Sequence, residues 1–181
     1  MSPLRSLRSD ARRNRERLIE AARVAFAELG TGVPLDEIAR RAQIGNATLY
    51  RHFPTRDDLI VAVYAEEVAE LCDVKAAADP LDGLFDWLAA FVRHVTEKGG
   101  LARSLEPSTQ RSGLHEEWHA AMSETVGRLV ERAQQAGMLR VDVDPLDLLQ
   151  VAAGMAAAEP ARVKRMLHMV RRGVVASGAD Q

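Results

Sequence analysis

The chain has 181 residues, of which 47% are hydrophobic and 28% are charged, a composition typical of a folded protein. Its single cysteine, Cys72, excludes an intrachain disulfide and a cysteine-based zinc finger, and agrees with a reducing compartment. No apolar segment is long enough to span a bilayer, and the N-terminus lacks the apolar core of a signal peptide, so we expect a cytoplasmic protein without membrane contact.

The net charge of −2 hides an uneven distribution along the chain. Eleven arginines against eight acidic residues give the first 60 residues a charge of +3, while the remaining 13 basic and 18 acidic residues give −5. A basic head on an acidic body is typical of a protein in which only the head contacts a polyanion. A solvated basic tail has the same charge pattern, and charge alone does not decide between the two.

The first 77 residues have the periodicity of four helices, predicted over residues 10–29, 35–42, 46–53 and 55–77. Gly30 ends the first helix, and Pro54 ends the third. Thr55-Arg56-Asp57-Asp58 predicts the cap at which the fourth begins. The apolar stripe of the first helix consists of Leu18, Ala22, Ala25, Phe26 and Leu29.

The rest of the chain also lacks strand patterns. A helix is predicted from Asp79-Pro80 to Gly99-Gly100, followed by a short piece at 101–105 and a long helix from Leu114 to Gly137. Two more helices are predicted to begin at Asp144-Pro145 and at Glu159-Pro160. About nine helices and no sheet indicate an all-α fold.

The segment from Pro34 to Phe53 consists of two short predicted helices joined by Gln43-Ile44-Gly45. Two such helices with so short a connection form a helix-turn-helix. The outer face of the second helix presents Asn46, Thr48, Tyr50, Arg51 and His52. These side chains can donate to phosphates or base edges, which favours a helix that enters the DNA major groove. An ordinary helical hairpin with a polar outer face fits the same spacing.

The segment GVPLDEIARRAQIGNATLYRHFPTRDDLIVAVY, residues 32–64, resembles the DNA-binding domain of TetR-family transcriptional regulators, above all in its ATLYRHF core. The resemblance implies a homodimer that binds palindromic double-stranded operator DNA, usually as a repressor, with neither enzymatic activity nor a cofactor. It also implies an N-terminal arm and DNA-binding domain in residues 1–58. Residues 59–181 would then form a helical domain that binds a small-molecule effector and forms the dimer.

The resemblance further implies which residues contact DNA. Phosphate contacts are expected from Thr48, Tyr50 and His52. Base contacts at the start of the recognition helix are expected from Asn46 and Ala47. A grip on the DNA backbone is expected from Arg56, and further contacts from Arg51, Arg12 and Arg13.

Two residues of the turn depart from the family pattern. Gln43 stands where the family usually has glycine, and Gly45 stands where it often has a capping serine. If Gln43 adopts the usual positive φ, the strain costs roughly 1 kcal/mol. Gly45 can still cap the following helix weakly. These departures concern the local geometry of the turn and leave the rest of the motif intact.

The sequence HEEWH, from His115 to His119, matches the HExxH signature of zinc metalloproteases. Histidines at this spacing share a helix face and could bind zinc, alone or with His94 as a regulatory metal site. A zinc-dependent hydrolase also needs a third ligand and a cleft beside a sheet, and the chain offers no strand. A helical interaction module without DNA binding is a further alternative, against which the intact family positions argue.

The C-terminal half supplies bulky and adaptable side chains that could line an effector pocket or simply fill a core. The candidates for pocket walls are Trp87, Phe91, Trp118, Met122 and Met155. Small residues around Gly154 would let another helix approach closely, in a two-fold four-helix seam or within the monomer. A solvated helix face is expected from Glu66, Glu67 and Glu70.

Overall fold

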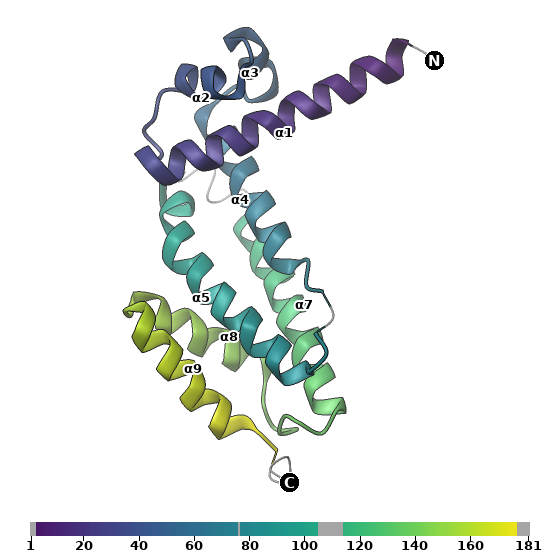
Figure 1. Ribbon diagram of the computed structural model, residues 1–181, viewed down its shortest axis with the longest axis vertical. Helices are drawn as coiled ribbons and strands as arrows, with labels where there is room; N and C mark the ends of the chain where they lie inside the picture. The colour runs from purple at the N-terminus through teal and green to yellow at the C-terminus, as the bar shows by residue number, and fades with distance from the viewer. Residues whose placement is uncertain (1–2, 76, 105–113, 177–181) are drawn as a thin grey trace. The chain divides into compact units, whose positions relative to one another are not determined.

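The computed structural model describes residues 3–75, 77–104 and 114–176, and the surroundings of side chains in 9–75, 77–97 and 116–176. Helices dominate these ranges, without a strand, so the predicted all-α fold is confirmed (Figure 1). The elements are α1 (Pro3–Leu29), α2 (Leu35–Ala42), α3 (Asn46–His52), α4 (Arg56–Cys72), α5 (Pro80–Ser104), α7 (Leu114–Gln135), α8 (Pro145–Gly154), the 3₁₀ helix η1 (Met155–Ala157) and α9 (Pro160–Val174).

The described residues form two compact units. Unit 1 contains residues 3–66 with 101–104, and unit 2 contains residues 67–100 with 114–176. The division falls within α4 and again within α5, so two continuous helices contribute residues to both units. The domain boundary that the sequence suggests at residue 58 remains a prediction.

The core of unit 1 forms around the apolar stripe of α1. Leu18, Ala22, Ala25 and Phe26 are buried, as predicted. The expectation for Leu29 is wrong, because its side chain is 57% exposed. Leu29 is the last residue of α1, and Gly30, at φ +78°, turns the chain away from the helix axis.

The cap predicted before α4 is a reciprocal capping box. The backbone N–H of Asp58 donates to Oγ1 of Thr55 at 3.1 Å, and the backbone N–H of Thr55 donates to the Asp58 carboxylate at 2.9 Å. Two helix-terminal N–H groups are thereby satisfied. Asp144 caps α8 in a similar way, since its carboxylate accepts from Leu146 N at 2.7 Å.

Three helix limits differ from the sequence prediction. α1 begins at Pro3 and not at residue 10, so the basic segment that precedes residue 10 is also helical. α4 ends at Cys72 and not at residue 77. At this end the indole N–H of Trp87 donates to the Leu71 carbonyl at 2.9 Å and satisfies one of the terminal acceptors of the helix.

α5 continues through Gly99-Gly100 to Ser104, where the sequence predicted a break and a separate short helix. Each glycine weakens a helix by roughly 1 kcal/mol relative to alanine, but a glycine pair does not force the backbone out of the helical region. The long helix therefore tolerates both residues.

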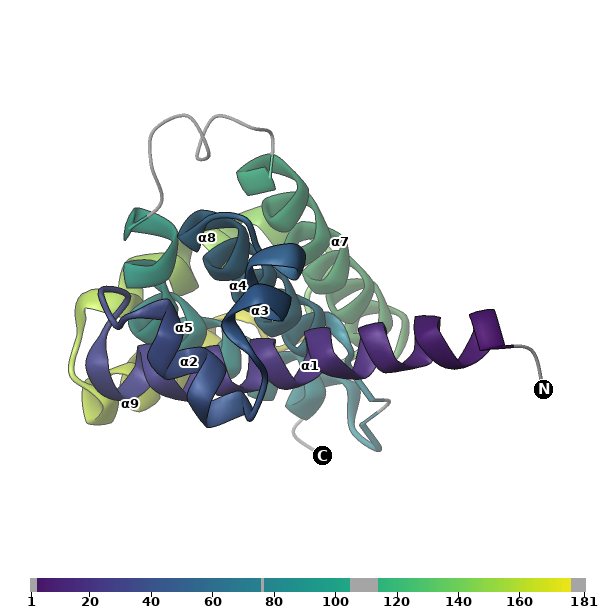
Figure 2. The same cartoon turned by 90° about the horizontal axis from the view of Figure 1, so that it is seen from above.

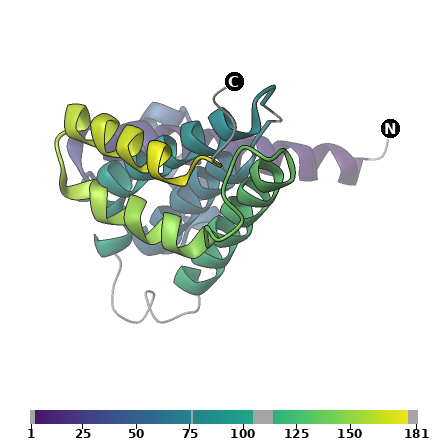
Figure 3. The same cartoon turned by 90° about the horizontal axis from the view of Figure 1, so that it is seen from below.

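The core of unit 2 includes Leu84 and Leu88 of α5 and Val126 and Val130 of α7, which are fully buried. The chain turns back at η1, so that α8 and α9 form a helical pair at the C-terminal end (Figure 3). Of the helices in the described ranges, none combines the length and apolar character needed to cross a membrane.

Candidate nucleic-acid interface

A tight left-handed turn joins α2 to α3. Gln43 lies at φ 54° and ψ 44°, the positive φ expected of the residue that replaces glycine here. Its N–H donates to the Arg40 carbonyl at 3.0 Å, and the N–H of Ile44 donates to the Ala39 carbonyl at 2.9 Å. Gly45 is extended and offers no side-chain cap, although its carbonyl accepts from Thr48 N at 2.8 Å. The turn is thus closed by backbone hydrogen bonds despite both departures.

The inner side of the helix-turn-helix is apolar and tightly buried. Ile38 and Ala39 of α2 have no exposed surface, and Leu49 of α3 is 1% exposed. Ala42, the last residue of α2, and Phe53, directly after α3, are also buried. Figure 2 shows α2 and α3 beside the long α1. Such burial sets the direction in which the outer face of α3 points.

The outer face of α3 is open to solvent and has no acidic residue. Tyr50 is 48% exposed, while Thr48 and His52 are half-buried. Arg51 folds back along its own helix, where its Nε donates to the Ala47 carbonyl at 3.2 Å and its Nη2 donates to Thr48 Oγ1 at 3.0 Å. The exposed side chains of this face are Asn46, Ala47, Tyr50 and Arg51. The geometry allows these groups to meet phosphates and base edges.

The arginines expected to reach DNA from the N-terminus lie within α1 and already have acidic partners. Arg12 donates through Nε to Glu16 at 2.8 Å, and this hydrogen bond raises the pKa of Arg12. Arg13 forms an ion pair with Asp10. Both side chains are exposed, so each could exchange its carboxylate for a phosphate. Their contact with DNA remains a prediction.

Arg56 holds the backbone of its own unit. Its Nη1 donates to the carbonyls of Thr31 at 2.7 Å and Val33 at 2.5 Å, which fixes the loop between α1 and α2. The side chain is half-buried. The sequence resemblance suggested only a phosphate contact for this residue, and that contact remains a prediction beside the observed internal role.

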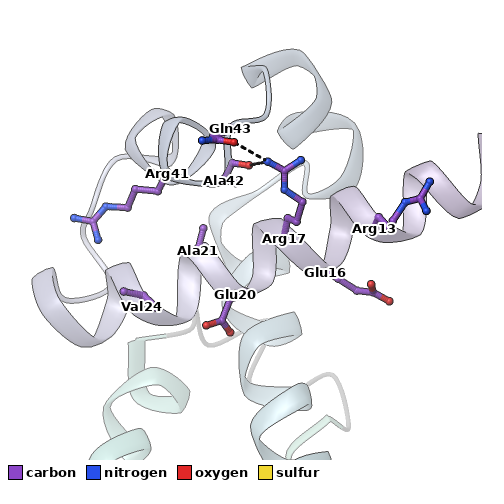
Figure 4. Close-up of a pocket in the computed structure, with 9 residues that line it drawn as sticks. All are labelled: Arg13, Glu16, Arg17, Glu20, Ala21, Val24, Arg41, Ala42 and Gln43. Atoms are coloured by element: carbon purple, nitrogen blue, oxygen red, sulfur yellow. Dashed lines mark hydrogen bonds between the residues drawn. The ribbon is translucent and has the colours of Figure 1, made fainter.

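Sequence reasoning missed Arg17. From α1, its Nη2 donates to the Ala42 carbonyl at 2.5 Å and lies 3.5 Å from the side-chain oxygen of Gln43 (Figure 4). Arg17 therefore ties α1 to the end of α2, at the strained turn. Nothing in the sequence pattern signals a contact between a side chain and a backbone carbonyl 25 residues away.

A second missed feature is an ion-pair chain along α2. Glu37 accepts hydrogen bonds from Arg40 and Arg41, and Arg41 also donates to Glu28 of α1 at 2.6 Å. The bonds from Arg40 and then Arg41 lower the pKa of Glu37 to about 2. Consequently α2 presents little free positive charge, although two of its eight residues are arginines.

The residues proposed as effector-pocket walls are all buried in unit 2. Trp87 and Phe91 stack with ring centroids 5.6 Å apart at an interplanar angle of 13°. Trp118, Met122 and Met155 are between 2% and 8% exposed. Burial fits both a pocket wall and a packed core, so the pocket assignment remains a prediction.

The prediction that three glutamates form a solvated face of α4 is wrong for Glu67. Glu66 and Glu70 are exposed, but Glu67 is only 7% exposed. Glu67 shares the helix face of Tyr64 and Val68, and that face is buried. With His94 and Thr125, it belongs to a small set of buried polar residues in unit 2.

The HEEWH segment lies at the start of α7. His119 is exposed, and its Nδ1 lies 3.3 Å from Oγ of Ser123. The side chain of His115 falls outside the described part of the chain. Trp118 and Met122 lie on the buried side of α7. Among the side chains described, no three His, Cys, Asp or Glu residues group so as to hold a metal ion.

Two family models match the chain. One, described as "Bacterial regulatory proteins, tetR family", matches residues 18–63, which include the helix-turn-helix. The other, described as "Transcriptional regulator SbtR-like, C-terminal domain", matches residues 79–176, more than half of the chain. Together the two matches account for a helix-turn-helix head and a helical body.

Solved structures and curated relatives agree with these matches. A TetR transcriptional regulator from Streptomyces coelicolor is 33% identical, with a TM-score of 0.76 over 91% of this chain and 99% of that chain. A TetR transcription regulatory protein from Mycobacterium vanbaalenii is 35% identical, with a TM-score of 0.73 over 93% of this chain and 99% of that chain. An HTH-type transcriptional regulator of Staphylococcus aureus is 38% identical over 63 residues. That match spans 34% of this chain and only 34% of the relative's own length.

Proposed function

The chain belongs to the TetR family of transcriptional regulators, and on this premise we propose that it is a dimeric repressor released from a palindromic operator by a small molecule. Regulators of this family are DNA-binding proteins and not enzymes, which leaves the hydrolase hypothesis for HEEWH without support. Because the partner is DNA, the proposed place of action is the cytoplasm.

The observation that most directly supports DNA binding is the outer face of α3. This face has no acidic residue, and its Tyr50 is 48% exposed, while the opposite side of α3 is buried. In the proposed complex, α3 enters the major groove. Asn46 and Ala47 read base edges, while Thr48, Tyr50 and His52 contact phosphates. Arg51 leaves its intrahelical bonds for the DNA, and Arg56 keeps the motif rigid.

Exposed apolar side chains near the C-terminus support the proposed dimer. Leu146 and Val151 of α8 are 54% and 46% exposed, and Met169 of α9 is 70% exposed. Ala153 and Gly154 are small and exposed beside them. A second copy that packs its own α8 and α9 here would cover this apolar surface in a four-helix seam.

Release from DNA follows from the geometry of two heads on one operator. Successive major grooves are about 34 Å apart, so only one spacing of the two recognition helices fits. A small molecule that binds better to another spacing shifts the population away from the DNA-bound form. Its proposed site is in unit 2, where Trp87, Phe91, Trp118, Met122 and Met155 would form the walls.

A footprint and a fluorescence-anisotropy titration with the DNA that flanks the protein's own gene test this function. Tyr50→Ala and His52→Ala should weaken specific binding, and the affinity should fall steeply with salt concentration. Gln135→Ala, a change at an exposed residue of α7, serves as the control. Light scattering should give a mass of twice the 19.9 kDa chain. Equal affinity for operator and unrelated DNA would refute the proposal and leave the interaction module as the alternative.

A further inference from the structure

A groove of about 580 Å³ runs between α5 and α9 within unit 2. Two contacts fix its walls near opposite ends. Thr96 Oγ1 donates to the Ala156 carbonyl at 3.0 Å, and Arg171 forms an ion pair with Asp82 at 2.6 Å. The two helices therefore lie antiparallel along the groove. A volume of this size lies within the range of small-molecule sites.

The floor of the groove is apolar. Phe85 and Val92 of α5 and Leu167 of α9 line it while each is less than 10% exposed, and Ala89 and Val163 are half-buried at its sides. The space exists where Ala89, the smallest of these side chains, stands on α5. Apolar side chains at the base of an open groove favour a ligand with an apolar body.

Positive charge without acidic partners stands above this floor. Arg93 of α5 and Lys164 of α9 line the groove, are exposed, and form no ion pair or hydrogen bond within the described part of the chain. Arg171 differs, since it is paired with Asp82 and its guanidinium lies 5.5 Å from the centre of the Phe85 ring. α9 as a whole has five Lys and Arg residues and no acidic residue.

Two carboxylates also line the groove, and their spacing matters. Asp86 and Glu97 are both on α5, eleven residues apart, which is about 16 Å along a helix. Arg93 lies between them on the same helix, one turn before Glu97, and Lys164 lines the groove from α9. The groove thus holds two cations that have no ion pair within the described residues, above an apolar floor, an arrangement that an anion stabilises.

We propose that this groove binds an amphipathic organic anion, a carboxylate or sulfonate on an apolar chain or ring. The acid group is held by Arg93 and Lys164, and the apolar part rests on Phe85, Val92 and Leu167. The site is separate from the buried aromatic cluster around Trp87. It does not depend on the regulatory function, because its test measures ligand binding and not operator binding.

The test uses the full chain with 8-anilinonaphthalene-1-sulfonate as a fluorescent probe and decanoate as competitor. Decanoate should displace the probe, and decyltrimethylammonium, with a similar chain and the opposite charge, should not. The double variant Arg93→Gln/Lys164→Gln should bind decanoate at least about tenfold more weakly, the value of one charge-assisted hydrogen bond. Ala89→Trp, which fills the groove, should abolish displacement.

The matched control is Arg162→Gln/Arg165→Gln, which removes two exposed cations of α9 that do not line the groove. It should weaken binding much less than the groove variant does, because neither side chain lines the groove and exposed charges interact weakly through water. Equal loss in both double variants would mean a general charge effect and would overturn the proposal. So would displacement by the ammonium compound, or a lack of probe binding because a second copy covers the groove.

Discussion

Replacing Gln43 with glycine should stabilise the protein. Gln43 lies at φ 54°, and the left-handed conformation costs a non-glycine residue roughly 1–2 kcal/mol. Glycine removes that strain but gains freedom in the unfolded chain, which costs about 0.5–1 kcal/mol. The substitution also removes the contact between Arg17 Nη2 and the Gln43 side-chain oxygen, but this contact is 3.5 Å long and exposed, so its loss costs little stability. The difference between the two ranges is a net gain of about 0–1.5 kcal/mol, or at most about 6 °C in Tm for a chain of this length.

Urea denaturation followed by circular dichroism measures this change. Gln135→Gly is the matched control, because Gln135 is also exposed and near a helix end but has an ordinary negative φ. There the same substitution should destabilise by about 0.5–1 kcal/mol. Gln43→Ala keeps the Cβ and should change stability little. If Gln43→Gly lowers stability as Gln135→Gly does, the assignment of strain to this turn is refuted.

Three further predictions concern unit 1. Thr55→Ala should lower the free energy of unfolding by about 0.5–2 kcal/mol in urea, because Oγ1 no longer accepts from Asp58 N–H or donates to the Asp58 carboxylate, while the backbone N–H of residue 55 is kept. Arg56→Met should cost about 1–3 kcal/mol by leaving two loop carbonyls without a donor, and Arg56→Lys should cost less. Glu37 should titrate near pH 2 in carbon-detected NMR. Since its pKa is lowered by folding, the stability added by its ion pairs is present above about pH 4.3 and is lost as the pH falls towards 2.

Each of these predictions has a clear contrary result. A Thr55→Ala variant as stable as the wild type would mean that the Thr55 hydroxyl forms no net stabilising contact. Equal losses for Arg56→Met and Arg56→Lys would show that the carbonyl contacts are not what stabilises the loop. For Glu37, the stability difference between wild type and Glu37→Gln should shrink between about pH 4.3 and pH 2. A difference that stays constant over this range would contradict the role of its ion pairs.

Features with a local or periodic cause could be predicted from the sequence. The limits of α2 follow from Pro34 and from the turn residue Gln43, and α8 begins where Asp144 and Pro145 predict. The buried stripe of α1 follows from its spacing. The helix through Gly99-Gly100 could not be predicted, because glycine weakens a helix without forbidding it.

Contacts between distant segments left no pattern in the sequence. Arg17 and Arg56 bond to backbone carbonyls, which every residue provides, so no residue type at the other end identifies the contact. The burial of Glu67 could have been inferred from its position on the apolar face of α4, but its charge favoured the opposite prediction. In each case the outcome depends on which segments pack together in the folded protein, and the local sequence does not specify this.

The ion pairs that arginines form within unit 1 affect how many counterions are released when the protein binds DNA. Six of the nine arginines described between residues 9 and 60 form ion pairs with carboxylates of the same unit. When such an arginine turns to a phosphate, the phosphate sheds a condensed cation, but the abandoned carboxylate attracts another from solution. The two ionic exchanges oppose each other. The number of counterions released per head is therefore smaller than a count of its arginines suggests.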